Sequence, residues 1–183
     1  SLTQRMHLAR DRYGVKPLYY AEHGGTFLFS SEIKAMMPHP AFRAAMDPHA
    51  LVEYLTFQNF FSERTLFKGV QLLPAGTHAV YDAGSGSLHQ EMYWDFDFVD
   101  GGADIDPDAA LEELDRLFCQ AVERQMVSDT EIGSYLSGGL DTGSIAAVAA
   151  ALAPSLKTFT VGFDLSSSKG LEIGFDERAQ AEE

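Results

Sequence analysis

A polar run in the second half of the chain has the composition of a phosphate-binding loop: Tyr135-Leu136-Ser137-Gly138-Gly139-Leu140-Asp141-Thr142-Gly143-Ser144. Its adjacent glycines let the backbone turn tightly and bring N–H groups close to an anion, with no Cβ atom in the way. The hydroxyls of Ser137, Thr142 and Ser144 add hydrogen-bond donors. A helix that begins after the loop adds the partial positive charge of its N-terminus. These features predict a site that holds phosphate.

Asp141 narrows the choice of ligand. A carboxylate would repel a bare phosphate, so we expect Asp141 to bind Mg²⁺ that accompanies a nucleotide. The expected ligand is therefore a triphosphate or a pyrophosphate. No Lys follows the glycines, which excludes the Walker A loop. The alternative is a serine-glycine turn that only caps a helix, and the extended pattern before the loop and the alanine-rich run after it disfavour that interpretation.

Helical and extended patterns alternate around the loop. We expect a helix over residues 107–126, a strand over 131–136, a helix over 144–152 and a strand over 156–162. This order predicts a parallel α/β sheet with its ligand at the carboxyl ends of the strands. Cys119 is predicted to be a packed core thiol, because it shares helical spacing with Leu111, Leu114, Phe118 and Val122.

The first half of the chain is predicted to be rich in β-structure. Short apolar runs predict strands at residues 6–9, 18–21, 26–29, 78–81 and 88–93. A glycine-containing turn over 22–25 is expected to join the strands at 18–21 and 26–29 into a hairpin. A second such turn, over 83–87, is expected to join the strands at 78–81 and 88–93.

Two helices and one charged turn complete the predictions for this half. Ser30 or Ser31 is expected to cap a short helix that ends at residue 37. Asp47 as cap and Pro48 at the first position predict another helix. We expect that helix to bury Leu51, Val52 and Leu55. The charged residues Asp11, Arg12 and Lys16 favour a solvated turn with local ion pairs.

Composition limits the class of protein. The 183-residue chain is 45% hydrophobic and 22% charged, as in folded soluble proteins. Its formal net charge of −14 argues against a nucleic-acid partner. We expect no membrane partner and a cytoplasmic location, because no apolar run reaches roughly 20 residues and the N-terminus lacks a signal-peptide pattern. The single cysteine fits a reducing compartment, and the six histidines show no metal-site spacing.

Five motifs, in order along the chain, resemble those of the glutamine-hydrolysing asparagine synthetase family. They are the runs at residues 10–20 (RDRYGVKPLYY), 30–35 (SSEIKA), 73–76 (LPAG), 137–142 (SGGLDT) and 159–163 (FTVGF). The fourth is similar to the Ser-Gly-Gly-x-Asp-Ser loop of the N-type ATP pyrophosphatases, with Thr142 in place of the usual Ser. The resemblance covers nearly the whole chain.

The resemblance implies an α+β part followed by an α/β part. The first is similar to the C-terminal part of an Ntn-type glutaminase domain with αββα layers, the class II glutamine amidotransferase domain. The second is similar to the start of a parallel-sheet ATP pyrophosphatase domain, which is adenine nucleotide alpha hydrolase-like. We expect these parts at residues 1–98 and 109–183, with an acidic, glycine-containing linker over 99–108. The chain is then expected to be an internal fragment.

The resemblance also implies a reaction. The full enzyme would use ATP and Mg²⁺ to convert aspartate to β-aspartyl-AMP with release of pyrophosphate. Ammonia from glutamine would then displace AMP and give asparagine. The small-molecule partners are therefore aspartate, glutamine and ATP, and a homodimer is allowed. The fragment itself is expected to be inactive, and poorly soluble or oligomeric when expressed alone.

Site residues follow from the same resemblance. The predicted ATP- and pyrophosphate-binding residues are Tyr135, Ser137, Gly138, Gly139, Leu140, Asp141, Thr142 and Val161, and Asp141 is the predicted metal ligand. No catalytic residue is expected for the glutaminase half, because the family's N-terminal Cys nucleophile would precede this chain. Ser1 is not expected to replace that nucleophile.

Two other functions remain open on the sequence. One is another amide-forming, adenylating enzyme of the same family, such as a β-lactam synthetase or a peptide cyclase, with a different acceptor. The other is a non-catalytic nucleotide-binding module. The retained carboxylate and hydroxyls of the loop favour an enzyme over the module.

Overall fold

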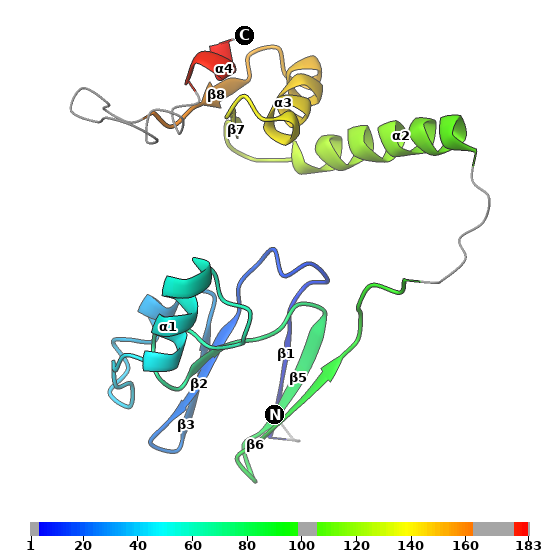
Figure 1. Ribbon diagram of the computed structural model, residues 1–183. Helices are drawn as coiled ribbons and strands as arrows, with labels where there is room; N and C mark the ends of the chain where they lie inside the picture. The colour runs from blue at the N-terminus through cyan, green and yellow to red at the C-terminus, as the bar shows by residue number, and fades with distance from the viewer. Residues whose placement is uncertain (1–3, 99–105, 163–177, 183) are drawn as a thin grey trace. The chain divides into compact units, whose positions relative to one another are not determined.

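The computed structural model describes residues 4–98, 106–162 and 178–182 of the chain (Figure 1). It combines helices with small β-sheets, as predicted for a mixed α/β chain. The chain divides into two compact units, Ser1–Val99 and Asp100–Glu183. None of the helices formed by the described residues has the length and apolar character that a membrane crossing requires.

One antiparallel sheet of the first unit has the strand order β1-β5-β6. Its strands are β1 (Arg5–Ala9), β5 (Thr77–Asp82) and β6 (Ser87–Met92). The predicted hairpin in the second half of this unit is confirmed, because β5 pairs with β6 over its whole length. Side chains of β5 alternate between buried and half-buried, which shows that one face of the sheet packs on a core.

A second antiparallel sheet has the order β3-β2-β4. It consists of β3 (Thr26–Ser30), β2 (Tyr19–His23) and β4 (Val70–Leu72). The β2-β3 hairpin agrees with the prediction for this segment. β4 has too few residues for a sequence pattern to predict, and its pairing with β2 defines it as a strand.

The two sheets share an apolar core. Its buried members are Leu8 on β1, Ala79 on β5, Tyr20 on β2 and Leu73 after β4. Phe27 of one sheet stacks on Tyr81 of the other, with ring centroids 4.1 Å apart. The two sheets therefore pack face to face, and this layer is the centre of the first unit.

The segment that follows β3 covers the opposite face of the β3-β2-β4 sheet. Ala21 and Val70 from that sheet are buried against Met36 and Phe42. The short 3-10 helix η1 (Ile33–Ala35) leads into this segment. The predicted short helix forms only over these residues, and its predicted cap is wrong: no side chain caps η1, because Ser30 Oγ accepts from the N–H of Glu32 in a local turn.

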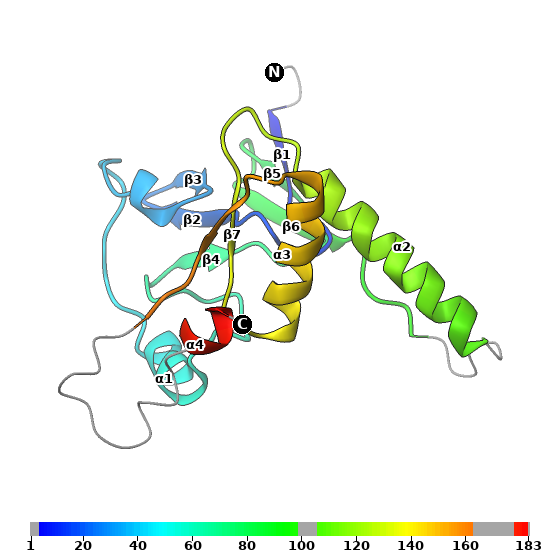
Figure 2. The ribbon, with the colours of Figure 1, turned by 90° about the horizontal axis from the view of Figure 1, so that it is seen from above.

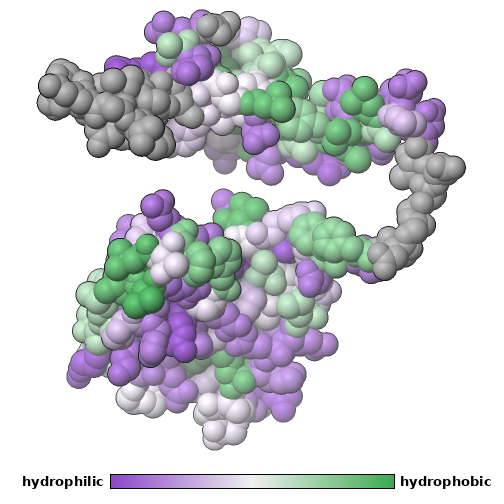
Figure 3. Space-filling view, viewed as in Figure 1, coloured by the Kyte–Doolittle hydropathy of each residue, from purple (hydrophilic) through white to green (hydrophobic). Residues whose placement is uncertain are grey.

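Helix α1 (Pro48–Phe57) begins at the predicted cap, where Asp47 accepts hydrogen bonds from the N–H groups of His49 and Ala50. The predicted burial of its apolar residues is wrong for two of the three: Leu51 is half-buried, but Val52 is 64% exposed and Leu55 is 71% exposed. The face that packs inward carries Ala50. Since each residue turns a helix by about 100°, neither Val52 nor Leu55 shares that face. Figure 3 shows the resulting hydrophobic patch over α1.

The charged turn after β1 is held by bonds from side chains to the backbone. The Arg10 guanidinium donates to the carbonyl oxygens of Gly14 at 2.7 Å, Leu73 at 2.7 Å and Lys16 at 3.1 Å. The Asp11 carboxylate accepts from three N–H groups, those of Tyr13, Val15 and Lys16. The expected ion pairs of Asp11, Arg12 and Lys16 do not form among the described residues.

The second unit contains a parallel pair of strands, as predicted. Strand β7 (Gly133–Tyr135) pairs with β8 (Lys157–Phe159) in the register Gly133 to Lys157 and Tyr135 to Phe159. Helix α2 (Pro107–Gln125) precedes β7, and α3 (Leu140–Leu152) joins the two strands. The short α4 (Arg178–Glu182) ends the described part.

Two details of the second unit differ from the sequence expectations. Helix α3 begins at Leu140, four residues before the predicted start, because the N–H of Gly143 already donates to the carbonyl of Gly139 at 2.9 Å. The predicted core stripe of α2 holds only near its C-terminal end. There Val122 is buried and Cys119 is half-buried, whereas Leu111 and Leu114 are 64% and 63% exposed.

Candidate functional site

The glycine loop connects the carboxyl end of β7 to the N-terminus of α3. Gly138 has φ +74°, in the left-handed region that favours glycine. Gly139 is the N-cap of α3 with φ −79° and ψ 155°, and it supplies no side-chain hydrogen bond to the first N–H groups of the helix. The first N–H groups of a helix have no acceptor within it. The loop therefore places free N–H donors at the end of a parallel strand, where α/β proteins bind ligands.

The structure brings two of the predicted hydroxyls together across the loop. Thr142 Oγ1 accepts a hydrogen bond from the Ser137 N–H at 3.2 Å and lies 3.0 Å from Ser137 Oγ. It also lies 3.2 Å from the Gly139 carbonyl, to which it donates. Both residues are half-buried. These bonds hold the loop closed from inside, a role that its sequence pattern alone does not show.

Strand β8 supports the loop from the other side. The Leu136 N–H donates to the Phe159 carbonyl at 3.0 Å, and the Thr160 hydroxyl donates to the Leu136 carbonyl at 2.7 Å. Sequence reasoning did not single out Thr160. The only signal for it is a polar residue beside the apolar Phe159 and Val161 at the end of a predicted strand.

The predicted nucleotide-contacting residues are exposed. Tyr135 is 75% exposed, Val161 is 68% exposed and Leu140 is 85% exposed, so none of the three belongs to a packed core. Asp141, the second residue of α3, is exposed as well. Across the described ranges, no three His, Cys, Asp or Glu side chains come together to hold a metal ion. Among the described residues, Asp141 therefore has no cluster of His, Cys, Asp or Glu side chains with which to share a cation.

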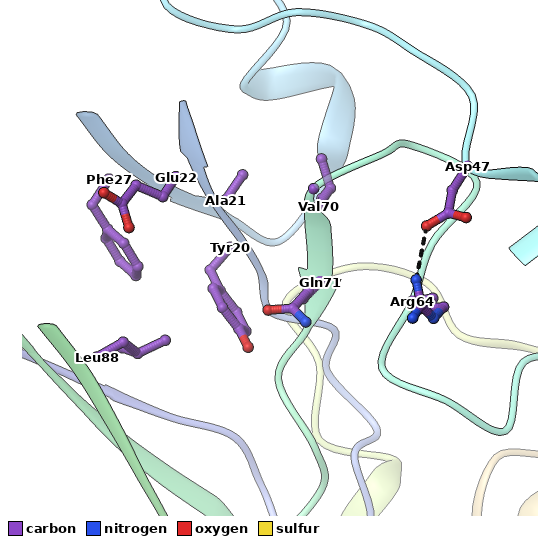
Figure 4. Close-up of a pocket in the computed structure, with 10 residues that line it drawn as sticks. Tyr20, Ala21, Glu22, Phe27, Asp47, Arg64, Val70, Gln71 and Leu88 are labelled. Atoms are coloured by element: carbon purple, nitrogen blue, oxygen red, sulfur yellow. Dashed lines mark hydrogen bonds and ion pairs between the residues drawn. The ribbon is translucent and has the colours of Figure 1, made fainter. Parts of the chain in front are cut away.

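The first unit contains a polar cavity of about 440 Å³ (Figure 4). Tyr20 and Gln71 line it, and burial raises the pKa of the Tyr20 hydroxyl. On one side Arg64 forms an ion pair with Asp47 at 3.2 Å. Because Asp47 also caps α1, this ion pair helps to hold the start of that helix in place. No Ser, Thr, Cys or His lines this cavity, so its described lining offers no nucleophile beside a base.

Comparison with known families agrees with the two units. Residues 1–94 match the family described as glutamine amidotransferase domain, and residues 113–183 match the family described as asparagine synthase. Since the first match covers just over half of the chain, the chain belongs to the glutamine amidotransferase family. The pairing of the two matches is the one expected for the glutamine-hydrolysing asparagine synthetases, which confirms the resemblance predicted from the motifs.

Individual relatives support the same assignment. Asparagine synthetase (glutamine-hydrolyzing) 3 of Bacillus subtilis strain 168 is 40% identical over 145 residues, which are 78% of this chain and 23% of that protein. Asparagine synthetase (glutamine-hydrolyzing) 1 of the same organism is 33% identical over 165 residues, 90% of this chain and 26% of the relative. Amidase chyE of Penicillium rubens is 34% identical over 198 residues, which cover 97% of this chain and 27% of that protein. The chain thus spans about a quarter of the length of these curated relatives.

Proposed function

We propose that the intact protein is a glutamine-hydrolysing asparagine synthase. It amidates aspartate with ATP through β-aspartyl-AMP, releases AMP and pyrophosphate, and takes ammonia from glutamine. The observation that carries this proposal is the Ser137–Thr142 loop, which lies at the carboxyl end of a parallel strand within the part that matches asparagine synthase. Adenylation is needed because a carboxylate is a poor electrophile and AMP is a good leaving group.

The donors of the loop fit a pyrophosphate group. Free N–H groups at the start of α3, together with the glycine backbone, offer hydrogen bonds to phosphate oxygens. We assign Ser137, Gly138, Gly139, Leu140 and Thr142 to this cradle. The exposed Asp141 carboxylate would hold Mg²⁺ jointly with phosphate oxygens. Bound Mg²⁺ would stabilise the charge that builds on the leaving pyrophosphate.

The ends of the two parallel strands are proposed to hold the rest of the nucleotide. Tyr135 on β7 and Val161 after β8 would contact it through backbone groups. Support comes from the hydrogen bonds of Leu136 to Phe159 and Thr160, which fix the two strand ends side by side. Both residues are largely exposed.

We further propose the finer fold and the cellular setting. Residues 1–98 would be part of an Ntn-type αββα glutaminase domain, 99–108 a linker, and 109–183 the start of an ATP pyrophosphatase domain. The two facing sheets support the first assignment. The reaction would take place in the cytoplasm, where its substrates are made, and a homodimer is the assembly to test by light scattering.

The test is pyrophosphate exchange into ATP by the intact protein. We expect exchange that requires aspartate and Mg²⁺, followed by asparagine formation with either glutamine or ammonium. Exchange with another acid in place of aspartate would contradict the acceptor and favour a related adenylating enzyme. Absence of exchange with any carboxylic acid, in protein that binds ATP, would favour a non-catalytic module.

A further inference from the structure

Two histidines meet on the outer face of the β1-β5-β6 sheet. His7 Nδ1 lies 3.1 Å from His78 Nε2, and the two ring centroids are 5.3 Å apart. Strands β1 and β5 lie side by side in Figures 1 and 2, with Ala9 opposite His78 in the register. The residues that follow the two histidines, Leu8 and Ala79, are buried in the core between the sheets. Because side chains alternate along a strand, both rings lie on the face turned away from that core.

The separation of the two ring nitrogens is close to that of a chelating pair. Zinc–imidazole bonds are about 2.0–2.1 Å long, so two nitrogens bound to one tetrahedral ion lie about 3.3 Å apart. The observed distance is 3.1 Å. His7 is exposed and His78 is half-buried, which leaves the pair accessible from solvent and lets the exposed ring turn toward an ion. The two residues are 71 positions apart in the chain, so no spacing in the sequence could indicate the pair.

A cation can take the place of the hydrogen that the two rings share. In the structure one ring nitrogen bonds to the other, and only one of them can supply the N–H. A neutral imidazole carries its hydrogen on either nitrogen, so the donor ring becomes a ligand when that hydrogen moves to its other nitrogen. Both lone pairs can then face one ion. Glu91 on β6 stands opposite His78 in the register, and its negative charge favours a cation.

The two donors select the kind of cation. Imidazole nitrogens suit first-row transition ions such as Zn²⁺, Ni²⁺ and Cu²⁺, whereas Mg²⁺ prefers oxygen ligands. Within the part of the chain that the structure describes, no third His, Cys, Asp or Glu side chain joins the pair. Water would therefore fill the other positions around the ion, as it does in open zinc sites.

We propose that His7 and His78 form a two-histidine site for a divalent transition-metal ion, with Zn²⁺ as the ion to test. The histidines belong to different strands, so the bound ion links β1 to β5. It thereby stabilises the first unit, because a ligand that binds only the folded chain shifts the folding equilibrium toward that state. The site is independent of the proposed function, since neither histidine belongs to the loop between β7 and α3.

Calorimetry with Zn²⁺ alone tests the site, in the intact protein without a histidine tag. We expect His7→Gln and His78→Gln each to weaken the binding seen in wild type by about tenfold or more, because a single imidazole cannot chelate. The double variant should show little further loss, since either change alone destroys the pair. Equal affinity of wild type and His7→Gln would overturn the proposal. So would a wild-type dissociation constant above about 1 mM.

His89→Gln is the matched control. His89 is an exposed histidine on β6, and it shares Val80 as its register partner with His7, so it lies on the same face of the sheet. It is His7, however, whose ring reaches the His78 nitrogen. The Zn²⁺ affinity of His89→Gln should therefore stay within about twofold of wild type. A loss as large as that of His7→Gln would overturn the assignment to the His7–His78 pair.

Melting curves of the first unit give a second readout. Zn²⁺ should raise the melting temperature of wild type and of His89→Gln, and should leave that of His7→Gln unchanged. In the presence of a chelator the three proteins should melt at similar temperatures, because both substituted side chains are exposed. If His78→Gln does not fold, His7→Gln decides the question by itself. A wild-type melting temperature that Zn²⁺ does not raise would contradict the link between β1 and β5.

Discussion

The Ser137 N–H and the Thr142 hydroxyl close the loop between β7 and α3 with a hydrogen bond of 3.2 Å. The same hydroxyl donates to the Gly139 carbonyl and lies beside Ser137 Oγ. The residue at this position therefore shapes the loop from inside, before any ligand arrives. This gives a physical reason why Thr can stand where the related loops have Ser: both supply the hydroxyl.

Thr142→Val tests that relationship. Valine keeps the shape and removes the hydroxyl, which leaves the half-buried Ser137 N–H without its acceptor. At about 1 kcal/mol for each net hydrogen bond lost, we expect ATP–pyrophosphate exchange to fall by about tenfold or more. Thr142→Ser is the control and should be near neutral. Equal exchange rates for the Val and Ser variants would show that the hydroxyl does not organise the loop.

Asp141→Asn tests the metal ligand. The amide keeps the size of the side chain and removes the charge that attracts Mg²⁺, so exchange should fall below about a tenth of wild type. Raised magnesium should recover part of the activity. Asp129→Asn, which removes an exposed carboxylate elsewhere in the same unit, is the control. Exchange at the wild-type rate in Asp141→Asn would place this carboxylate away from the metal.

Asp11 predicts a dependence of stability on pH. Backbone N–H groups, of Lys16 first and Val15 next, lower its pKa in the folded chain below the ordinary value. A depressed folded pKa gives stability that is present above the unfolded pKa of about 3.9, and that is lost as pH falls through the folded value. Asp11→Asn should therefore lower the melting temperature at pH 7, and its difference from wild type should shrink below about pH 4. Asp97→Asn is the control, and a difference that does not vary with pH would contradict the linkage.

Arg10→Lys tests the carbonyl cluster after β1. A lysine ammonium cannot reproduce the planar fork that reaches Gly14, Lys16 and Leu73 together. We expect a loss of about 2 kcal/mol and a lower melting temperature for the first unit. Arg12→Lys is the matched control, since that neighbouring side chain is exposed. Identical melting temperatures for the two variants would show that the cluster contributes nothing.

Local patterns were sufficient to predict most elements. Asp47 and Pro48 predict the start of α1 because capping involves only neighbouring residues. The parallel pairing of β7 and β8 follows from their alternation with helices. The loop itself is predictable, since a glycine pair with hydroxyls before a helix is a local feature of the chain.

Long-range contacts explain what the sequence could not show. The apolar residues of α1 suggest a core face, yet the fully buried residue of this helix is Ala50, which lies on another side. The Arg10 guanidinium donates to the carbonyl of Leu73, 63 positions away. The sequence near Arg10 contains only other charged residues, which suggested local ion pairs and gave no sign of this distant partner. The contact of His7 with His78 has no local signal either, because only the pairing of β1 with β5 brings the two rings together.

The bond from Gln90 Nε2 to the Tyr20 hydroxyl, at 2.7 Å, joins the two sheets of the first unit. An apolar layer resists separation more than sliding, because dispersion contacts re-form after a small lateral shift. A directional hydrogen bond does not re-form after such a shift. A slip of one residue, about 3.3 Å, would break it and leave two polar groups without partners beside a core. Tyr20 is buried and Gln90 half-buried, so water could not replace the bond freely. This bond therefore opposes sliding of one sheet over the other, in addition to the apolar contacts that oppose their separation.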